Sequence, residues 1–129
     1  MYEYKCKVVS VYDGDSITLD VDLGFHITHQ IKTRLFEIDT PEIKGEERKD
    51  GLVAKAHVQE WLERWGASDE PWPFVVTTHK TGKYGRWLAD IRPVDSTPAY
   101  GHKEDPLEIP SLVDSLKAAG HDTEDWRDW

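Results

Sequence analysis

Four acidic side chains and two arginines lie in four short polar clusters, each closing an apolar stretch of the chain. The clusters are Asp13-Gly14-Asp15, Arg34, Asp39-Thr40-Pro41-Glu42 and Lys83-Tyr84-Gly85-Arg86. Carboxylates bind hard cations, and guanidinium groups bind phosphate through forked hydrogen bonds. Together these residue types indicate the chemistry of phosphodiester hydrolysis.

Hydrolysis of a phosphodiester requires a neutralised phosphate, a stabilised transition state and a positioned water. Asp15 and Asp39 offer oxygen ligands that suit both Ca²⁺ and Mg²⁺, and the Thr40 carbonyl can add a neutral one. Pro41 disfavours helix at the preceding residue, so Asp39 and Glu42 are expected on a fixed turn. Glu42 can then act as general base towards the attacking water.

Each cluster also has an ordinary structural explanation when it is taken alone. Asp-Gly-Asp is common turn chemistry, and Lys-Tyr-Gly-Arg fits a hairpin loop. A single arginine such as Arg34 is more often a structural ion-pair partner than a catalyst. The order and context of all four clusters favour the functional interpretation.

The elements that must position these residues follow from hydrophobic periodicity. Three strands, a helix that Asp50 caps and Gly66 ends, two further strands and a short helix capped by Ser111 are predicted. A bulge is expected in the third strand to bring its isoleucines to the core. The predicted ranges are 5–12, 16–22, 25–37, 51–66, 74–79, 87–91 and 111–120. This order is typical of an α+β, mainly β fold, a five-stranded OB barrel with two helices.

Length and composition suit one domain of 129 residues. It divides into a core over 5–92, a proline-rich excursion over 93–110, and a C-terminal helix with an acidic tail over 111–129. No apolar run could span a membrane, no signal peptide is evident, and the single cysteine favours a cytoplasmic protein of a bacterium or phage. The net charge of -9 predicts weak, salt-sensitive binding to nucleic acid.

The four clusters, in this order, resemble the motifs of the staphylococcal nuclease (thermonuclease) family. The matching segments are Val11-Tyr12-Asp13-Gly14-Asp15-Ser16, Thr33-Arg34-Leu35, Ile38-Asp39-Thr40-Pro41-Glu42 and Lys83-Tyr84-Gly85-Arg86. The similarity covers about residues 5–92. It implies an SNase-like OB barrel and a Ca²⁺-dependent endonuclease that cuts DNA and RNA and leaves 3'-phosphate ends.

The resemblance also implies a role for each matching position. Asp15, Asp39 and Thr40 correspond to metal ligands, and Asp13 to an outer-shell acid. The remaining positions correspond to the phosphate clamps Arg34 and Arg86, the general base Glu42, and the phosphate contacts Lys83 and Tyr84. Mg²⁺ is a possible substitute for Ca²⁺. We expect a monomer.

Two features depart from the family pattern. Gly82 stands where the family usually has an acid, and the residue that stacks on a base, Tyr100 or Trp72, stays open. Alternatives to an enzyme are a non-catalytic module that binds nucleic acid or protein on the same barrel, and an interaction subunit that docks through the tail containing Trp126 and Trp129.

Overall fold

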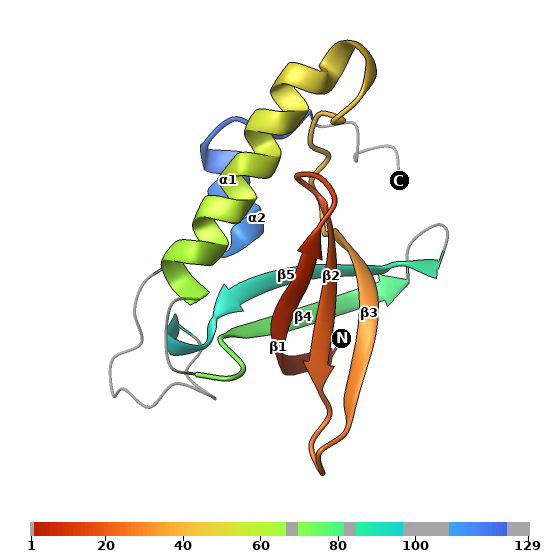
Figure 1. The fold of residues 1–129 in the computed structure, drawn as a ribbon, viewed down its shortest axis with the longest axis vertical. Helices are drawn as coiled ribbons and strands as arrows, with labels where there is room; N and C mark the ends of the chain where they lie inside the picture. Colours follow the sequence, from red (N-terminus) through yellow and green to blue (C-terminus); the bar gives the residue numbers. More distant parts are fainter. Residues whose placement is uncertain (1, 67–69, 82–84, 97–108, 124–129) are drawn as a thin grey trace.

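Five strands close into a barrel in the order β1-β2-β3-β5-β4 (Figure 1). The computed structural model describes residues 2–66, 70–81, 85–96 and 109–123. The strands are β1 (Tyr2–Val11), β2 (Ser16–Asp22), β3 (Thr28–Leu35), β4 (Phe74–Thr81) and β5 (Trp87–Pro93). The other elements are the helices α1 (Arg48–Gly66) and α2 (Leu112–Ala118) and the 3-10 turns η1 (Gly45–Glu47) and η3 (Val94–Ser96). The closed barrel with two helices confirms the predicted α+β, OB-like fold.

Alternation of side chains along the strands builds the core. Ile17, Leu19 and Val21 of β2 are buried and point into the barrel, as their spacing predicts. Neighbouring strands pair antiparallel, except β3 and β5, which run parallel. The parallel pair brings the end of β3 beside the start of β5, so that Arg34 pairs with Leu88.

The third strand is shorter than predicted. It spans Thr28–Leu35 rather than 25–37, because Phe25 lies in the turn that joins β2 to β3 and Glu37, at φ +53°, turns the chain after the strand. The predicted bulge is wrong, since β3 pairs with β2 in one continuous register. Ile31 and Leu35 share one face without it, while Ile27 is exposed.

Helix α1 begins earlier than its hydrophobic pattern indicated. Asp50 was expected to be the N-cap, but it lies in the first turn of a helix that starts at Arg48 and continues from η1. The end at Gly66 is as predicted. Ala54, Val58 and Trp61 are buried, so this face of α1 covers the barrel core.

Helix α2 follows the predicted cap. The Ser111 hydroxyl accepts a hydrogen bond from the Asp114 amide at 3.2 Å, and the helix ends two residues before Gly120, which has φ +80°. Asp90 of β5 ties the helix to the barrel, because its carboxylate accepts a hydrogen bond from the Val113 amide at 3.1 Å.

Among the described residues, none of the helices is long and apolar enough to cross a membrane. Most of the proline-rich excursion (97–108) and the end of the acidic tail (124–129) lie outside the described residues.

Candidate functional site

The turn between β1 and β2 presents the first acidic cluster. The Asp13 carboxylate accepts a hydrogen bond from the Asp15 amide at 3.1 Å, and the Tyr12 amide donates to the Ser16 carbonyl at 3.0 Å. An aspartate that binds the backbone two residues on is the usual Asx turn. Asp13 therefore has the turn-forming role suggested by its sequence, and this turn directs the Asp15 side chain into the protein.

Asp15 joins this hairpin to the loop that follows β3. Its side chain is only 6% exposed, and its carboxylate accepts a hydrogen bond from the Thr40 amide at 3.1 Å. Gly14 packs so closely that a Cβ there would lie 2.6 Å from the Thr40 hydroxyl. The hairpin turn thus holds the loop that carries Asp39, Thr40 and Glu42.

A second glycine holds the same loop from the other side. Gly51 of α1 is buried, and a Cβ at this position would overlap the Glu42 carbonyl. The Glu42 amide also donates to the Glu47 carboxylate at 3.0 Å. The loop is therefore clamped between the hairpin turn and the start of α1, with the Glu42 side chain exposed.

Arg34 lies between the two predicted metal-binding carboxylates. One nitrogen of its guanidinium group is 2.7 Å from an oxygen of Asp39 and 3.6 Å from an oxygen of Asp15. The two carboxylates, from different loops, therefore share one cationic partner. Of the two roles that the sequence offered for Arg34, an ion-pair partner and a phosphate clamp, the structure shows the ion pairs.

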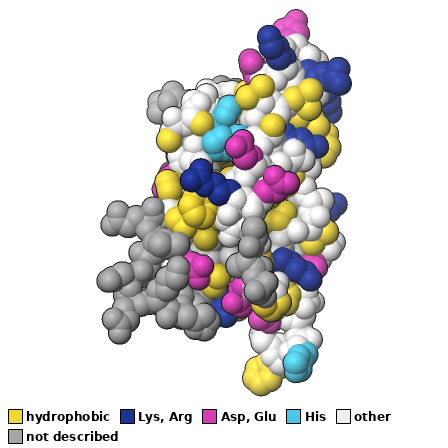
Figure 2. Space-filling view, turned by 60° about the vertical axis from the view of Figure 1, so that its left-hand side comes forward, with side chains coloured by type: hydrophobic (Ala, Val, Ile, Leu, Met, Phe, Trp, Pro, Cys, Tyr) yellow, Lys and Arg dark blue, Asp and Glu magenta, His cyan; other side chains and the backbone are white. Residues whose placement is uncertain are grey.

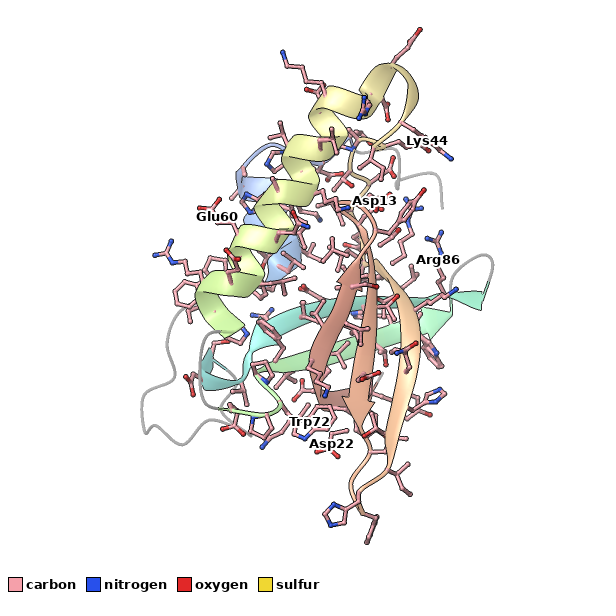
Figure 3. The ribbon with its side chains drawn as sticks, in the orientation of Figure 1. Asp13, Asp22, Lys44, Glu60, Trp72 and Arg86 are labelled. Carbon is pink, nitrogen blue, oxygen red and sulfur yellow. The ribbon has the colours of Figure 1, made fainter. Side chains whose placement is uncertain are left out.

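Arg86 reaches the same cluster through a serine. Its guanidinium donates to the Ser16 hydroxyl at 3.2 Å, and that hydroxyl donates to the Asp15 carboxylate at 3.2 Å. Figure 3 shows Asp13 and Arg86 on the same side of the molecule, with Asp22 at the opposite end of the barrel. Ser16 belongs to one of the four motifs, but its linking role depends on the pairing of β3 with both β2 and β5, which no local pattern predicts.

Asp39 is fixed by residues beyond α2 that sequence reasoning did not single out. The Asp39 amide donates to the Asp122 carboxylate at 3.2 Å. Thr123 donates twice, from its amide to the Asp39 carbonyl at 2.7 Å and from its hydroxyl to the Asp39 carboxylate at 2.8 Å. The segment expected to be an acidic tail thus supports the site. The signal that could have suggested it is Gly120, which lies two residues after the end of α2 and turns the chain there.

The electrostatics of the cluster leave negative charge poorly compensated. Burial, followed by the hydrogen bond and charge of Asp13, raises the pKa of Asp15 to about 7, although Arg34 and the Thr40 amide act to lower it. The Thr40 hydroxyl oxygen is buried and lacks a hydrogen-bond partner within the described part of the chain. A cation would compensate both features, so oxygens of Asp15, Asp39 and Thr40 fit a hard metal ion. The oxygen of Thr40 that lacks a partner is its hydroxyl, whereas the expected ligand was its carbonyl.

The cluster contains few metal-binding side chains. Within residues 2–66, 70–81, 85–96 and 109–123, no group of three or more His, Cys, Asp or Glu side chains is close enough to hold a metal. The centre therefore offers two carboxylates and neutral oxygens. Lys83, Tyr84 and Gly82 lie outside the described residues, as do Tyr100, Trp126 and Trp129. Trp72 lies near Lys7, with the ammonium group 5.3 Å from the ring centre, and away from this cluster (Figure 3).

Comparison with known proteins adds no identification. No protein-family model matches the chain, and no curated protein matches it.

Proposed function

We propose that this protein is a metal-dependent phosphodiesterase that hydrolyses DNA, RNA or both. The observation that carries the proposal is the convergence of Asp15, Asp39 and Arg34, with Arg86 linked to them through Ser16. Two carboxylates beside two guanidinium groups supply both a cation site and phosphate donors. The resemblance of the four motifs to the staphylococcal nuclease family supports the same chemistry and suggests endonucleolytic cleavage to 3'-phosphate ends.

The proposed roles divide by element. Asp15, Asp39 and Thr40 would hold Ca²⁺ or Mg²⁺, which when bound supplies positive charge to the phosphate. Arg86, at the start of β5, donates to a non-bridging oxygen in place of its present hydrogen bond to Ser16. Arg34 donates to a second oxygen once it leaves Asp39.

Glu42 is the proposed general base. Its side chain is exposed, and its backbone is held by Gly51 and Glu47 on the loop that carries Asp39. An exposed carboxylate on a clamped loop can accept a proton from a water that approaches the phosphate from solvent. The assignment needs no movement of the barrel.

The substrate would be bound weakly. The net charge is -9, and Figure 2 shows acidic and basic side chains intermingled on the face it displays. Because affinity for a polynucleotide comes largely from displaced counterions, we expect affinity to fall steeply as salt is raised.

One observation favours a second candidate, a module that binds nucleic acid or protein without cleaving it. The 2.7 Å contact between Arg34 and Asp39 occupies a donor that phosphate would need. If this pair is permanent, the cluster serves only to fasten the loop to the barrel.

Cleavage of denatured DNA and of single-stranded RNA, in Ca²⁺, Mg²⁺ or EDTA, tests the proposal. We expect cutting with a divalent cation, none in EDTA, and loss of cutting but not of binding in Glu42→Gln. Glu46→Gln, an exposed acid of η1 on the same connection, is the matched control and should cut normally. Binding of substrate with no cutting under any cation would replace the nuclease by the binding module.

A further inference from the structure

The turn between β2 and β3 carries an unusually exposed aromatic side chain. The Ile27 amide donates to the Gly24 carbonyl, and the Leu23 amide donates to the Ile27 carbonyl, each at 2.9 Å. These bonds close a tight turn with Phe25 and His26 at its centre. Phe25 is 96% exposed, and Leu23 and Ile27 beside it are 41% and 54% exposed.

The backbone of this turn is strained by the residues it contains. Phe25 has φ +54° and His26 has φ +60°, the left-handed region in which Asn and Gly are the usual occupants. A bulky residue there costs free energy, and strain of this kind is concentrated at functional sites. The turn therefore presents a phenyl ring to solvent at a conformational cost.

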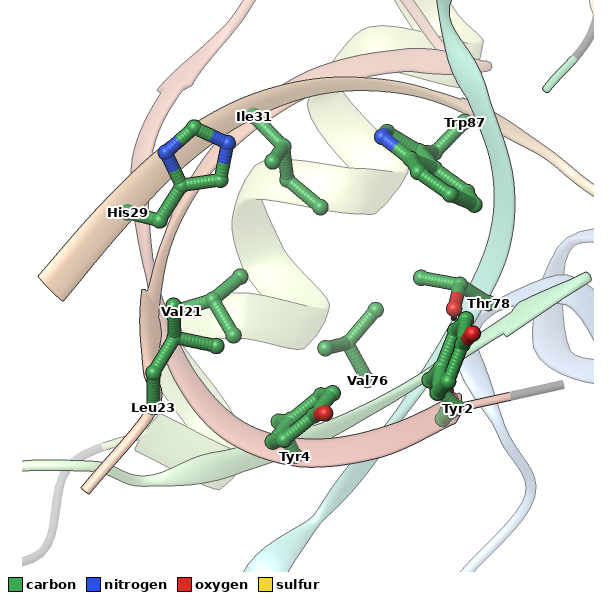
Figure 4. A pocket seen from close by; sticks show the side chains of 9 residues that line it. All are labelled: Tyr2, Tyr4, Val21, Leu23, His29, Ile31, Val76, Thr78 and Trp87. Carbon is green, nitrogen blue, oxygen red and sulfur yellow. Dashed lines mark hydrogen bonds between the residues drawn. The ribbon is translucent and has the colours of Figure 1, made fainter.

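The open end of the barrel provides a cavity beside this turn. Nine side chains line it, eight from the five strands and one, Leu23, from the turn after β2 (Figure 4). Its floor is formed by the buried Val21 and Val76, and its walls include Tyr4, Ile31 and Trp87. The lining is largely apolar. The hydroxyl of Thr78 on the wall is paired within the chain, because it donates to the Tyr2 carbonyl at 3.3 Å.

The cavity matches an aromatic ring in size. Its volume is about 180 Å³, and an apolar cavity of roughly 150 Å³ is enough to bind benzene. Phe25 cannot fill the cavity of its own chain, because at 96% exposure its side chain makes almost no contact there. In Figure 2 a hydrophobic side chain beside a histidine stands clear of the lower end of the molecule.

We propose that two copies of this chain associate through these features, each inserting its Phe25 into the barrel mouth of the other. The protruding ring and the ring-sized cavity occur on one surface, which makes that surface self-complementary, as a two-fold interface requires. The rim residues Tyr2 and Leu23, 58% and 41% exposed, are covered in the same contact. The proposed occupant is thus a second copy, in place of the monomer expected from the sequence.

This interface leaves the candidate catalytic cluster open. Asp15 precedes β2, whereas Leu23 follows it, so the two features lie at opposite ends of that strand. Association is independent of the proposed nuclease activity. It is opposed by the charge of -9 on each copy, and raising the salt concentration should therefore strengthen the dimer.

Sedimentation equilibrium of the full chain, from micromolar to millimolar concentration, tests the proposal. We expect a reversible dimer whose dissociation constant falls as NaCl is raised from 50 to 500 mM. Phe25→Ser should raise that constant about a hundredfold, because each dimer loses two buried phenyl groups worth about tenfold each. Tyr2→Asp, which places a negative charge on the rim of the cavity, should weaken the dimer as well.

The matched control is Val9→Ser, which removes an apolar side chain that is 49% exposed on β1 but lies outside the cavity. It should leave the dissociation constant within about twofold. A wild-type chain that stays monomeric at millimolar concentration overturns the proposal, as does a dimer that survives Phe25→Ser. Binding of the monomer to uncharged phosphatidylcholine vesicles through Phe25, with no dimer formed, would assign the turn to a lipid surface instead.

Discussion

Replacing Gly51 by alanine sets two effects of opposite sign against each other. Alanine is preferred to glycine inside a helix by about 1 kcal/mol, so a variant judged by helix propensity alone should be more stable. The structure predicts the reverse. A Cβ at this position overlaps the Glu42 carbonyl and lies 2.8 Å from the Ile43 amide nitrogen.

The magnitude follows from what must move. The atoms that block the Cβ belong to the backbone of a loop held between α1 and the β1–β2 turn, so no side-chain rotation relieves the overlap. Overpacking of this kind costs about 1 to 3 kcal/mol, and a rigid backbone obstacle places it at the upper end. After the gain in propensity, Gly51→Ala should lose about 2 kcal/mol of unfolding free energy, a fall of roughly 7 °C in Tm for this length.

Urea unfolding monitored by circular dichroism gives the free energy, with Ala56→Gly as the matched control. Ala56 is an exposed position of the same helix, so this variant should be destabilised by about 1 kcal/mol through propensity alone. Both variants are then destabilised, although their substitutions run in opposite directions. A Gly51→Ala protein more stable than wild type would show that α1 does not clamp the Glu42 loop.

Three further predictions concern the site and its support. Arg86→Ala should lower kcat about 10²- to 10³-fold if its guanidinium stabilises the transition state, while Arg92→Ala, which removes an exposed arginine of β5, the strand that follows Arg86, should not. A loss of only a few-fold would make Arg86 structural. Ca²⁺ at about 100 times its Kd should stabilise the folded chain by about 2.7 kcal/mol, and this gain should vanish in Asp15→Asn. A Tm that does not change in millimolar Ca²⁺ would count against the site. Burial raises the pKa of Asp90, so the folded state keeps a proton that the unfolded chain releases, and stability should fall as pH rises from about 4 towards the raised pKa. Asp90→Asn should make that fall shallower in EDTA, and equal slopes for both proteins would refute the assignment.

Local signals predicted the parts of the fold that depend on local chemistry. The alternation of Ile17, Leu19 and Val21 was enough to define β2, because one face of a strand must be buried. Ser111 marked the start of α2, because its hydroxyl satisfies an amide of the first turn. The start of α1 was missed because η1 runs directly into it, so the hydrophobic pattern begins after the helix does.

The site depends on contacts that no local pattern contains. Thr123 and Asp122 hold Asp39 across more than eighty residues of sequence, and their composition is that of an ordinary polar tail. Ser16 links Arg86 to Asp15 only because β5 lies beside β3 in the barrel. The sequence therefore identified which side chains could act but not which of them support one another.

The position of Arg34 couples two binding events, the binding of a cation by the acids and the binding of phosphate by the guanidinium group. Arg34 is the cation that ion-pairs with both Asp15 and Asp39 among the described residues. If Arg34 turned to a phosphate with nothing in its place, the charged carboxylate of Asp15, whose side chain is 6% exposed, would be left uncompensated, which costs several kcal/mol. Either a proton on Asp15, whose pKa is raised to about 7, or a metal cation must therefore replace the guanidinium, and the metal cation is the replacement favoured at higher pH. Binding of a short oligonucleotide should accordingly weaken sharply in EDTA, and this loss should be smaller in Arg34→Ala, where only the direct attraction between the cation and the phosphate is left. Equal cation dependence in the two proteins would mean that Arg34 never exchanges its carboxylate partners for phosphate.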